Sequence, residues 1–109
     1  MTRPARLDET AVTEWVGAHP EWSLREGRLV RDLTTRDYPS AVRVVGAQVD
    51  LAEGLDHHAL ITLGHRTVRL ELWTHDRGGV TQLDLDYAQA FDDLVAGEYA
   101  NLLATRDPG

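Results

Sequence analysis

The chain has 109 residues, of which 42% are hydrophobic and 27% charged, and its formal net charge is −7. This length and composition suit one folded domain with a small core. The acidic charge argues against nucleic acid and anionic membrane surfaces as partners, because both attract basic patches. The chain contains no cysteine, which excludes disulfides, thiolate catalysis and cysteine-ligated metals. No apolar run approaches the roughly 18 residues of a membrane span and no secretory signal is evident, so we expect a cytoplasmic protein.

The first third of the chain predicts a helix followed by a hairpin. Apolar residues recur at helical spacing between residues 7 and 16. Pro20 ends this helix, because its ring and its missing N–H cannot continue one. Strands are then expected over 22–25 and 28–33, joined by a tight turn in which Gly27 can take a positive φ.

A second helix is expected from Asp37 to about Gly54. Asp37 is a suitable N-cap, and Pro39 is tolerated in the first turn. Six apolar residues in this segment form one stripe at spacings of three and four, a pattern typical of a helix that packs on a core. They are Tyr38, Ala41, Val42, Val45, Val49 and Ala52.

The rest of the chain predicts a second hairpin and a third helix. The strands cover 59–63 and 67–74, and apolar and polar residues alternate in the second of them, so that one face is buried and the other open. Trp73 lies on the open face and could stack a flat ligand or cover a dimer contact. Thr81 is expected to cap the last helix, with Asp84 as its capping-box partner. The residues expected to face the core from here on are Leu83, Tyr87, Phe91, Leu94, Val95 and Leu102.

The predicted elements follow the order α-β-β-α-β-β-α. Two hairpins and three helices in this order indicate an α+β fold, with a four-stranded antiparallel sheet that carries the helices on one face. The pattern does not give the order of the strands within the sheet.

Three of the five histidines stand at the ends of expected strands. His57 and His58 precede the third strand, and His75 follows the fourth. The start of one hairpin strand and the end of its antiparallel partner are neighbours in space, so all three side chains can meet at the open end of one hairpin. Histidine gains and loses protons near neutral pH, and converging histidines can give and take protons in one turnover. Glu53, one turn before His57, could orient an imidazole.

Two other interpretations of these histidines stay open. Histidines at strand ends are often solvated surface residues with no chemical role. A zinc site is the other possibility, but zinc needs three or four ligands aimed at one point. Adjacent strand residues point to opposite faces, and the sequence has no H-E-x-x-H motif. We therefore expect no metal site.

The histidine spacing resembles that of the pterin-4a-carbinolamine dehydratases, also called 4a-hydroxytetrahydrobiopterin dehydratases. Their motif is a glutamate, three residues, His-His, and a histidine seventeen positions after the second histidine. Glu53, His57, His58 and His75 fit this motif, and Asp84 falls where the family has an aspartate early in its last helix. The resemblance implies one pterin dehydratase-like domain over 1–109, with a four-stranded antiparallel sheet and three helices on one face.

The resemblance also implies an enzyme. The family is a group of hydro-lyases that remove water from 4a-hydroxytetrahydropterin and give the quinonoid dihydropterin, without a metal or other cofactor. His57 and His75 would be the acid/base pair, and His58 would mainly position the pterin. The supporting residues would be Glu53, Asp56 and Asp84. The expected partners are the pterin substrate and further copies of the chain, in a homodimer or homotetramer.

The sequence departs from the family pattern after the His-His pair. Where the family has Pro-x-aromatic, this chain has Ala59 and Ile61, and a further expected aromatic is replaced by His65. Ile61 keeps the wall of a pterin pocket apolar but stacks less well on a ring. Some family members are known as non-enzymes, so the alternative function is a catalytically weak, dehydratase-like scaffold or assembly factor that binds a protein partner.

Overall fold

The computed structural model describes residues 4–104. Its helices are α1 (Glu9–Ala18), α2 (Tyr38–Leu55) and α3 (Gln82–Ala96), and two short 3-10 turns are η1 (His75–Arg77) and η2 (Ala100–Leu102). Its strands are β1 (Ser23–Arg25), β2 (Arg28–Thr34), β3 (Leu60–Leu63) and β4 (Thr67–Leu72). The element order agrees with the one predicted from the sequence. No helix within 4–104 is long and apolar enough to cross a membrane.

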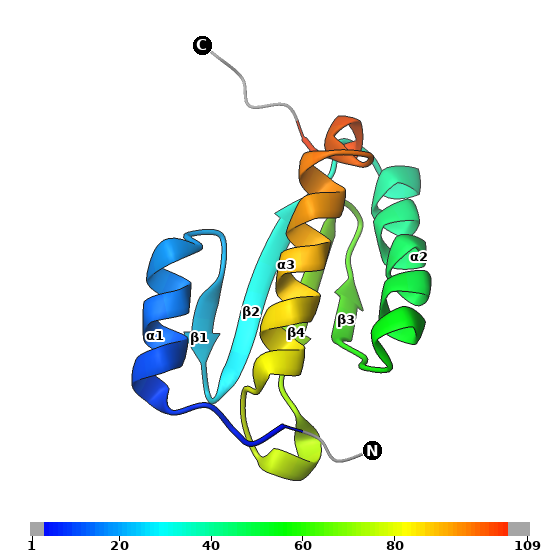
Figure 1. Ribbon diagram of the computed structural model, residues 1–109. Coiled ribbons are helices and arrows are strands. Elements are labelled where there is room, and N and C mark those ends of the chain that lie inside the picture. Colours follow the sequence, from blue (N-terminus) through cyan, green and yellow to red (C-terminus); the bar gives the residue numbers. More distant parts are fainter. Residues whose placement is uncertain (1–3, 105–109) are drawn as a thin grey trace.

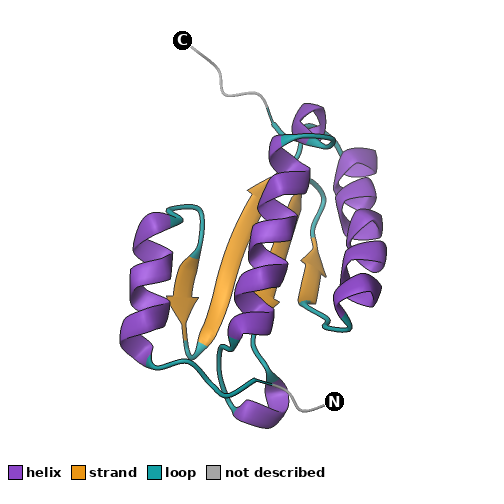
Figure 2. Cartoon of the chain, viewed as in Figure 1, coloured by secondary structure: helices purple, strands orange, loops and turns teal. Residues whose placement is uncertain are grey.

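The four strands form one antiparallel sheet in the order β1-β2-β4-β3. The two hairpins therefore join through β2 and β4, whose register runs from Leu29 opposite Leu72 to Thr34 opposite Thr67. The helices lie on one face of this sheet, with α3 across β2 and β4 and with α1 and α2 on either side of it (Figure 1, Figure 2). The predicted α+β fold is confirmed, and β1 and β3 are its edge strands.

Side-chain caps fix where the helices begin. Asp8 caps α1 and Asp37 caps α2, and each accepts a hydrogen bond of 2.8 Å from a backbone N–H in the first turn. Thr81 and Asp84 form a capping box at the start of α3. Each cap satisfies N–H groups that have no partner within the helix. The caps predicted for the second and third helices are confirmed.

The hydrophobic core lies between the sheet and the helices. β4 alternates as predicted, and its fully buried residues are Val68, Leu70 and Leu72. α3 contributes Tyr87, Phe91 and Val95 to the same cluster. Leu83 and Leu94, which the sequence placed in the core, are only partly buried, because the buried side of α3 runs through the other three residues.

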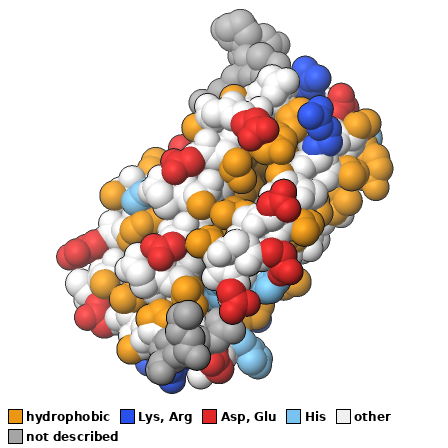
Figure 3. All heavy atoms as spheres, turned by 45° about the vertical axis from the view of Figure 1, so that its right-hand side comes forward, with side chains coloured by type: hydrophobic (Ala, Val, Ile, Leu, Met, Phe, Trp, Pro, Cys, Tyr) orange, Lys and Arg blue, Asp and Glu red, His pale blue; other side chains and the backbone are white. Residues whose placement is uncertain are grey.

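The apolar stripe predicted for the second helix coincides only in part with the face that packs on the core, since Ala41 and Ala52 are buried and Val45 packs against the core. The buried face of α2 is formed by Ser40, Ala41, Val44, Gln48 and Ala52. Three members of the predicted stripe are instead largely exposed, namely Tyr38 (47%), Val42 (43%) and Val49 (60%). Apolar residues occur on both sides of α2 and a glutamine interrupts the buried row, so the hydrophobic period alone includes exposed positions and omits Val44 and Gln48. Figure 3 shows hydrophobic side chains gathered on the side of the molecule where α2 lies.

The fourth strand ends earlier than predicted. β4 stops at Leu72, and beyond it Thr74 forms an isolated bridge with Gly79, whose carbonyl accepts the Thr74 N–H at 2.8 Å. Gly78 takes a φ of 67° at the end of η1, a conformation that a residue without a Cβ adopts at little cost. His75 therefore begins a tight turn instead of closing the strand.

A buried ion pair joins α3 to the sheet. Arg31 of β2 is 8% exposed, and its Nη1 donates to Oδ1 of Asp92 in α3. The indole N–H of Trp22 donates to both oxygens of the same carboxylate, at 3.0 and 3.1 Å. The carboxylate thereby neutralises a cation that would be costly to bury alone.

Candidate active site

The end of α2 places His57 inside the protein. Asp56 is the C-cap in the left-handed conformation, with a φ of 50°, and its N–H donates to the Ala52 and Glu53 carbonyls. The next N–H, that of His57, donates to the Ala52 carbonyl at 3.0 Å. This left-handed residue reverses the chain at the helix end, and His57 turns inward with 5% of its surface exposed. Asp56 is itself exposed, so its visible contribution is to the backbone turn.

Asp84 holds the His57 imidazole. Nε2 of His57 lies 2.5 Å from Oδ1 of Asp84, whose side chain is fully buried. The other carboxylate oxygen accepts the Thr81 N–H at 2.8 Å and the Thr74 hydroxyl at 2.9 Å. The two threonine hydroxyls are 2.7 Å apart. A buried chain of hydrogen bonds thus connects an imidazole, a carboxylate and the start of α3.

His75 is connected to this network through its neighbour in the chain. Thr74, which donates to Asp84, immediately precedes His75, and His75 is exposed in the first position of η1. The α2–β3 connection and η1 lie at the same end of the sheet (Figure 1). The structure therefore brings His57 and His75 to one end of the β3–β4 hairpin, as the sequence predicted.

His58 points to the surface. Its Nε2 lies 2.8 Å from a carboxylate oxygen of Glu53, and the two side chains are 64% and 70% exposed. Glu53 therefore orients the imidazole of His58, while that of His57 is held by Asp84. The two adjacent histidines differ sharply in environment, since one is buried and the other solvated.

A small hollow adjoins His58. It measures about 200 Å³, lies between α2, β3 and α3, and is largely apolar. Ile61 is partly buried and lines it, together with Ala59 and Glu53. The position of Ile61 is thus next to one of the predicted site histidines.

The two other aromatic positions discussed from the sequence lie in different surroundings. The guanidinium of Arg28 stands 3.9 Å from the ring centre of Trp73, so an arginine of the chain itself already stacks on that ring. His65 lies beside Tyr38, with ring centres 6.1 Å apart, at the start of α2. His65 therefore lies near the start of α2, whereas His57 and His58 follow its end.

The polar groups Gln48, Tyr87, Thr74 and Thr81 near the candidate site were not predicted as site residues. Gln48 is buried among the apolar residues of α2 and accepts the Tyr87 hydroxyl at 2.7 Å. Burial raises the pKa of Tyr87 to about 12. A glutamine within an apolar helix face is a sequence signal for such a buried pair, but only tertiary contacts identify its partner. In residues 4–104, no three histidine or carboxylate side chains converge so as to hold a metal ion.

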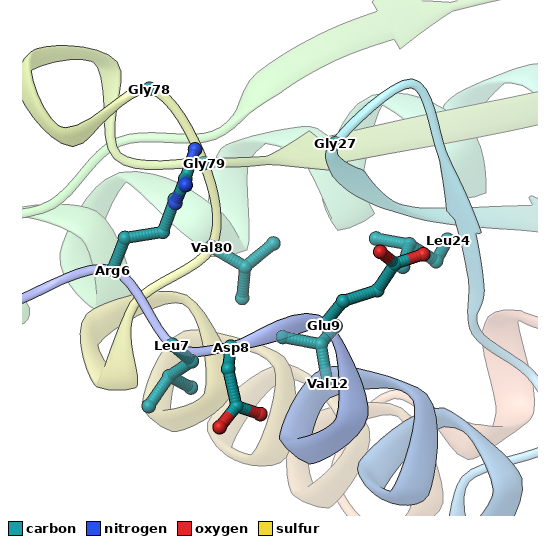
Figure 4. Close-up of a pocket in the computed structure, with 10 residues that line it drawn as sticks. All are labelled: Arg6, Leu7, Asp8, Glu9, Val12, Leu24, Gly27, Gly78, Gly79 and Val80. Carbon is teal, nitrogen blue, oxygen red and sulfur yellow. The ribbon is translucent and has the colours of Figure 1, made fainter.

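A larger hollow of about 570 Å³ lies elsewhere, between the start of α1, the β1–β2 turn and the segment after η1 (Figure 4). The stem of Arg6 crosses Gly79 so closely that a Cβ at Gly79 would lie 2.6 Å from Arg6 Cδ. None of the predicted site residues lines this hollow. It shares no lining residue with the hollow beside His58.

The chain matches the family model described as Pterin 4 alpha carbinolamine dehydratase over residues 5–94. It belongs to the pterin carbinolamine dehydratase family. Its relatives include proteins provisionally named pterin-4-alpha-carbinolamine dehydratase. One from Chloroflexus aurantiacus is 37% identical over 90 residues, covering 83% of this chain and 97% of the relative. Another from Streptomyces coelicolor is 38% identical over 96 residues, covering 87% and 95%.

A solved structure also supports membership of the dehydratase family. It is described as a transcriptional coactivator/pterin dehydratase from Brucella melitensis, and it superposes with a TM-score of 0.77 at 27% sequence identity. The superposition covers 82% of this chain and 97% of the other. The resemblance drawn from the histidine motif is thereby confirmed at the level of family and fold.

Proposed function

We propose that this protein dehydrates a 4a-hydroxytetrahydropterin to the quinonoid dihydropterin by histidine acid–base catalysis. Family membership gives the reaction class. The observation that carries the proposal is the 2.5 Å contact between the buried imidazole of His57 and Asp84. The same buried carboxylate accepts from Thr74, the residue before His75, which supports a shared site for His57 and His75.

The reaction requires two proton transfers and no redox partner. A proton is delivered to the hydroxyl on C4a, and the C–O bond breaks with release of water. A proton is taken from N5, and its bonding electrons form the double bond between C4a and N5. Two histidines that start in opposite protonation states meet this requirement, because one donates while the other accepts.

His57 is assigned as the base. Its Nε2 is occupied by Asp84, so Nδ1 is the nitrogen left to accept a proton. A carboxylate fixed in this way holds the ring in one tautomer and stabilises the imidazolium that forms, as in other His–Asp pairs. The buried side chain of Asp84 strengthens this effect, because water screens it little.

His75 is assigned as the acid, and His58 as a binding residue. His75 is exposed, so it can regain a proton from solvent after each turnover. His58 is held by Glu53 at 2.8 Å beside the apolar hollow, where it can donate to a polar edge of the pterin. Because a contact between two exposed side chains contributes little to stability, we assign the Glu53–His58 pair to binding.

The test is the dehydration of a synthetic 4a-hydroxytetrahydropterin, followed by ultraviolet absorbance with and without protein. His57→Ala and His75→Ala should each reduce kcat by about 10²-fold or more, whereas His58→Ala should act mainly on KM. His65→Ala is the matched control, since His65 lies at the other end of α2, and it should behave as wild type. Wild-type rates in both the His57 and His75 variants would refute the proposal.

We further propose that the protein is a homodimer or homotetramer. The exposed apolar residues of α2 and β3 support this assignment, and they include Val49 (60% exposed) and Leu60 (45% exposed). Edge strands with unpaired backbone groups favour pairing, and of the two edges, β1 and β3, the β3 edge is the more apolar. Light scattering should give a multiple of 12.2 kDa, and Val49→Lys should lower the mass. A monomer at micromolar concentration would contradict this proposal.

The same apolar face favours a second candidate function, that of a scaffold which binds a different protein. This function predicts no saturable binding of pterin in calorimetry. It also predicts that the histidine variants fold and still bind the partner. Saturable pterin binding that His58→Ala weakens would decide for the dehydratase.

A further inference from the structure

The hollow beside His58 contains an unusual polar group. Gln48 is 1% exposed and lines the hollow, and its Oε1 accepts the hydroxyl of Tyr87 at 2.7 Å. Its Nε2 is buried and has no hydrogen-bond partner among residues 4–104. A buried donor without an acceptor is costly, and such groups in native proteins call for an acceptor that the chain does not supply.

No residue in the wall of the hollow accepts a hydrogen bond from this Nε2, and the carboxylate of Glu53 is paired with His58. Its wall is formed mainly by aliphatic side chains, among them Val45, Val49 and Ile61. The Tyr87 hydroxyl is already used as a donor to Gln48. At about 200 Å³, the hollow exceeds the roughly 30 Å³ share of one water molecule several-fold. It therefore has room for a short chain of non-hydrogen atoms.

The hollow is also well placed with respect to the proposed chemistry. Tyr87 stands three residues after Asp84 on α3, so the two lie on the same side of that helix. Asp84 holds His57, and His58 and Glu53 form the rim of the hollow. In a pterin, only N5 separates C4a from C6. A ring whose C4a meets His57 therefore carries its C6 substituent close to the reacting atoms.

We propose that this hollow receives the substituent at C6 of the substrate pterin, and that Gln48 selects substituents with a hydrogen-bond-accepting oxygen. The inference rests on the proposed function and adds a specificity to it. The substituent fits as a short, mainly apolar chain whose oxygen accepts from Nε2 of Gln48. A site built to pair a substrate oxygen discriminates against the analogue that lacks it, because its own polar group is then left unpaired.

The test compares two 4a-hydroxytetrahydropterins of nearly equal shape, one with a 6-methoxymethyl group and one with a 6-propyl group. The wild-type protein should show a kcat/KM about tenfold higher for the 6-methoxymethyl substrate, as expected for one neutral hydrogen bond. Gln48→Leu should remove this preference. Gln89→Leu, an equivalent change at an exposed position of α3, should retain it.

A double variant guards against a loss of folding. Gln48→Leu alone leaves the Tyr87 hydroxyl without its acceptor, so Gln48→Leu with Tyr87→Phe removes both polar groups and replaces them with apolar groups of similar shape. Equal kcat/KM for the two substrates in wild type, or a preference that persists in the folded double variant, would overturn the inference and leave the dehydratase intact. Absence of turnover of either substrate by wild type would refute the dehydratase, and the inference with it.

Discussion

The carboxylate of Asp84 and the imidazole of His57 meet at 2.5 Å, although 27 positions separate them in the chain. The same carboxylate completes the capping box of α3. One side chain therefore both starts a helix and holds the central histidine of the candidate site. The position of His57 depends on the docking of α3 against the end of α2.

Asp84→Asn should show what the negative charge of Asp84 contributes to catalysis, apart from its role in capping α3. Asp84→Asn keeps the shape but removes the negative charge, so kcat should fall by about 10²-fold or more while KM changes little. Asp86→Asn on the same helix is the control, since Asp86 is exposed and accepts a hydrogen bond from the exposed side chain of Gln82. Steady-state kinetics on the folded variants checks the prediction. An Asp84→Asn protein with wild-type kcat would show that the charge has no part in catalysis.

Ile61→Trp should reduce the room in the hollow beside His58. Ile61 is partly buried and lines that hollow of about 200 Å³, and an indole adds apolar area that can pack against a pterin ring. We expect tighter binding of a 6-methyl pterin and weaker binding of pterins with long C6 substituents. Calorimetric titration with both ligands measures the two effects. Equal changes for the two ligands would place the indole outside the hollow.

Removing one partner of the buried Arg31–Asp92 pair should destabilise the fold more than removing both. Asp92→Ala leaves the Arg31 cation and the Trp22 indole N–H without their partner, and it should destabilise the fold by about 3–5 kcal/mol. Combining Arg31→Met with Asp92→Leu removes both charges and should recover most of this loss. Urea unfolding, monitored by tryptophan fluorescence, measures the free energy of unfolding of each variant. A double variant as unstable as Asp92→Ala would contradict the electrostatic explanation.

The exposed pair of Asp32 and Arg69 is a natural comparison for the buried pair. Arg69 donates to both carboxylate oxygens, at 2.7 and 3.0 Å, and these hydrogen bonds hold the pKa of Asp32 below its usual value. Because water screens this pair, Asp32→Ala should change the free energy of unfolding far less than Asp92→Ala does. Similar losses in the two variants would be inconsistent with burial as the cause.

Tyr87 should make the protein less stable in alkali. Its folded-state pKa is about 12 because the phenol is buried, whereas tyrosine in an unfolded chain ionises near pH ~10. Between these values the unfolded state loses the proton first, so the free energy of unfolding falls as pH rises. Tyr87→Phe should flatten this decline. Urea unfolding at several pH values from about 8 to 11 gives the slope of the free energy of unfolding against pH for the wild type and for Tyr87→Phe. Parallel slopes would exclude Tyr87 as the cause of the decline in stability.

Local patterns in the sequence determined the elements and the family. Alternation along 67–72 marked the buried face of β4, and Asp37, Thr81 and Asp84 marked the helix starts, because strand pleating and helix capping depend on residues a few positions apart. The spacing of Glu53, His57, His58 and His75 indicated the family, and the shared hairpin indicated that the histidines could meet.

Only the tertiary structure decided how the histidines differ and which face of α2 is buried. His57 pairs with Asp84 and His58 with Glu53, and this division depends on where α3 packs. The core face of α2 contains Gln48 while Val49 faces outward, the reverse of what hydrophobicity suggests. The hydrophobic period of a helix shows only how its apolar residues repeat. Which face of the helix is buried depends on the elements that pack against it. A buried hydrogen bond between Gln48 and Tyr87 offsets part of the cost of burying the glutamine amide, and no local pattern contains that partner.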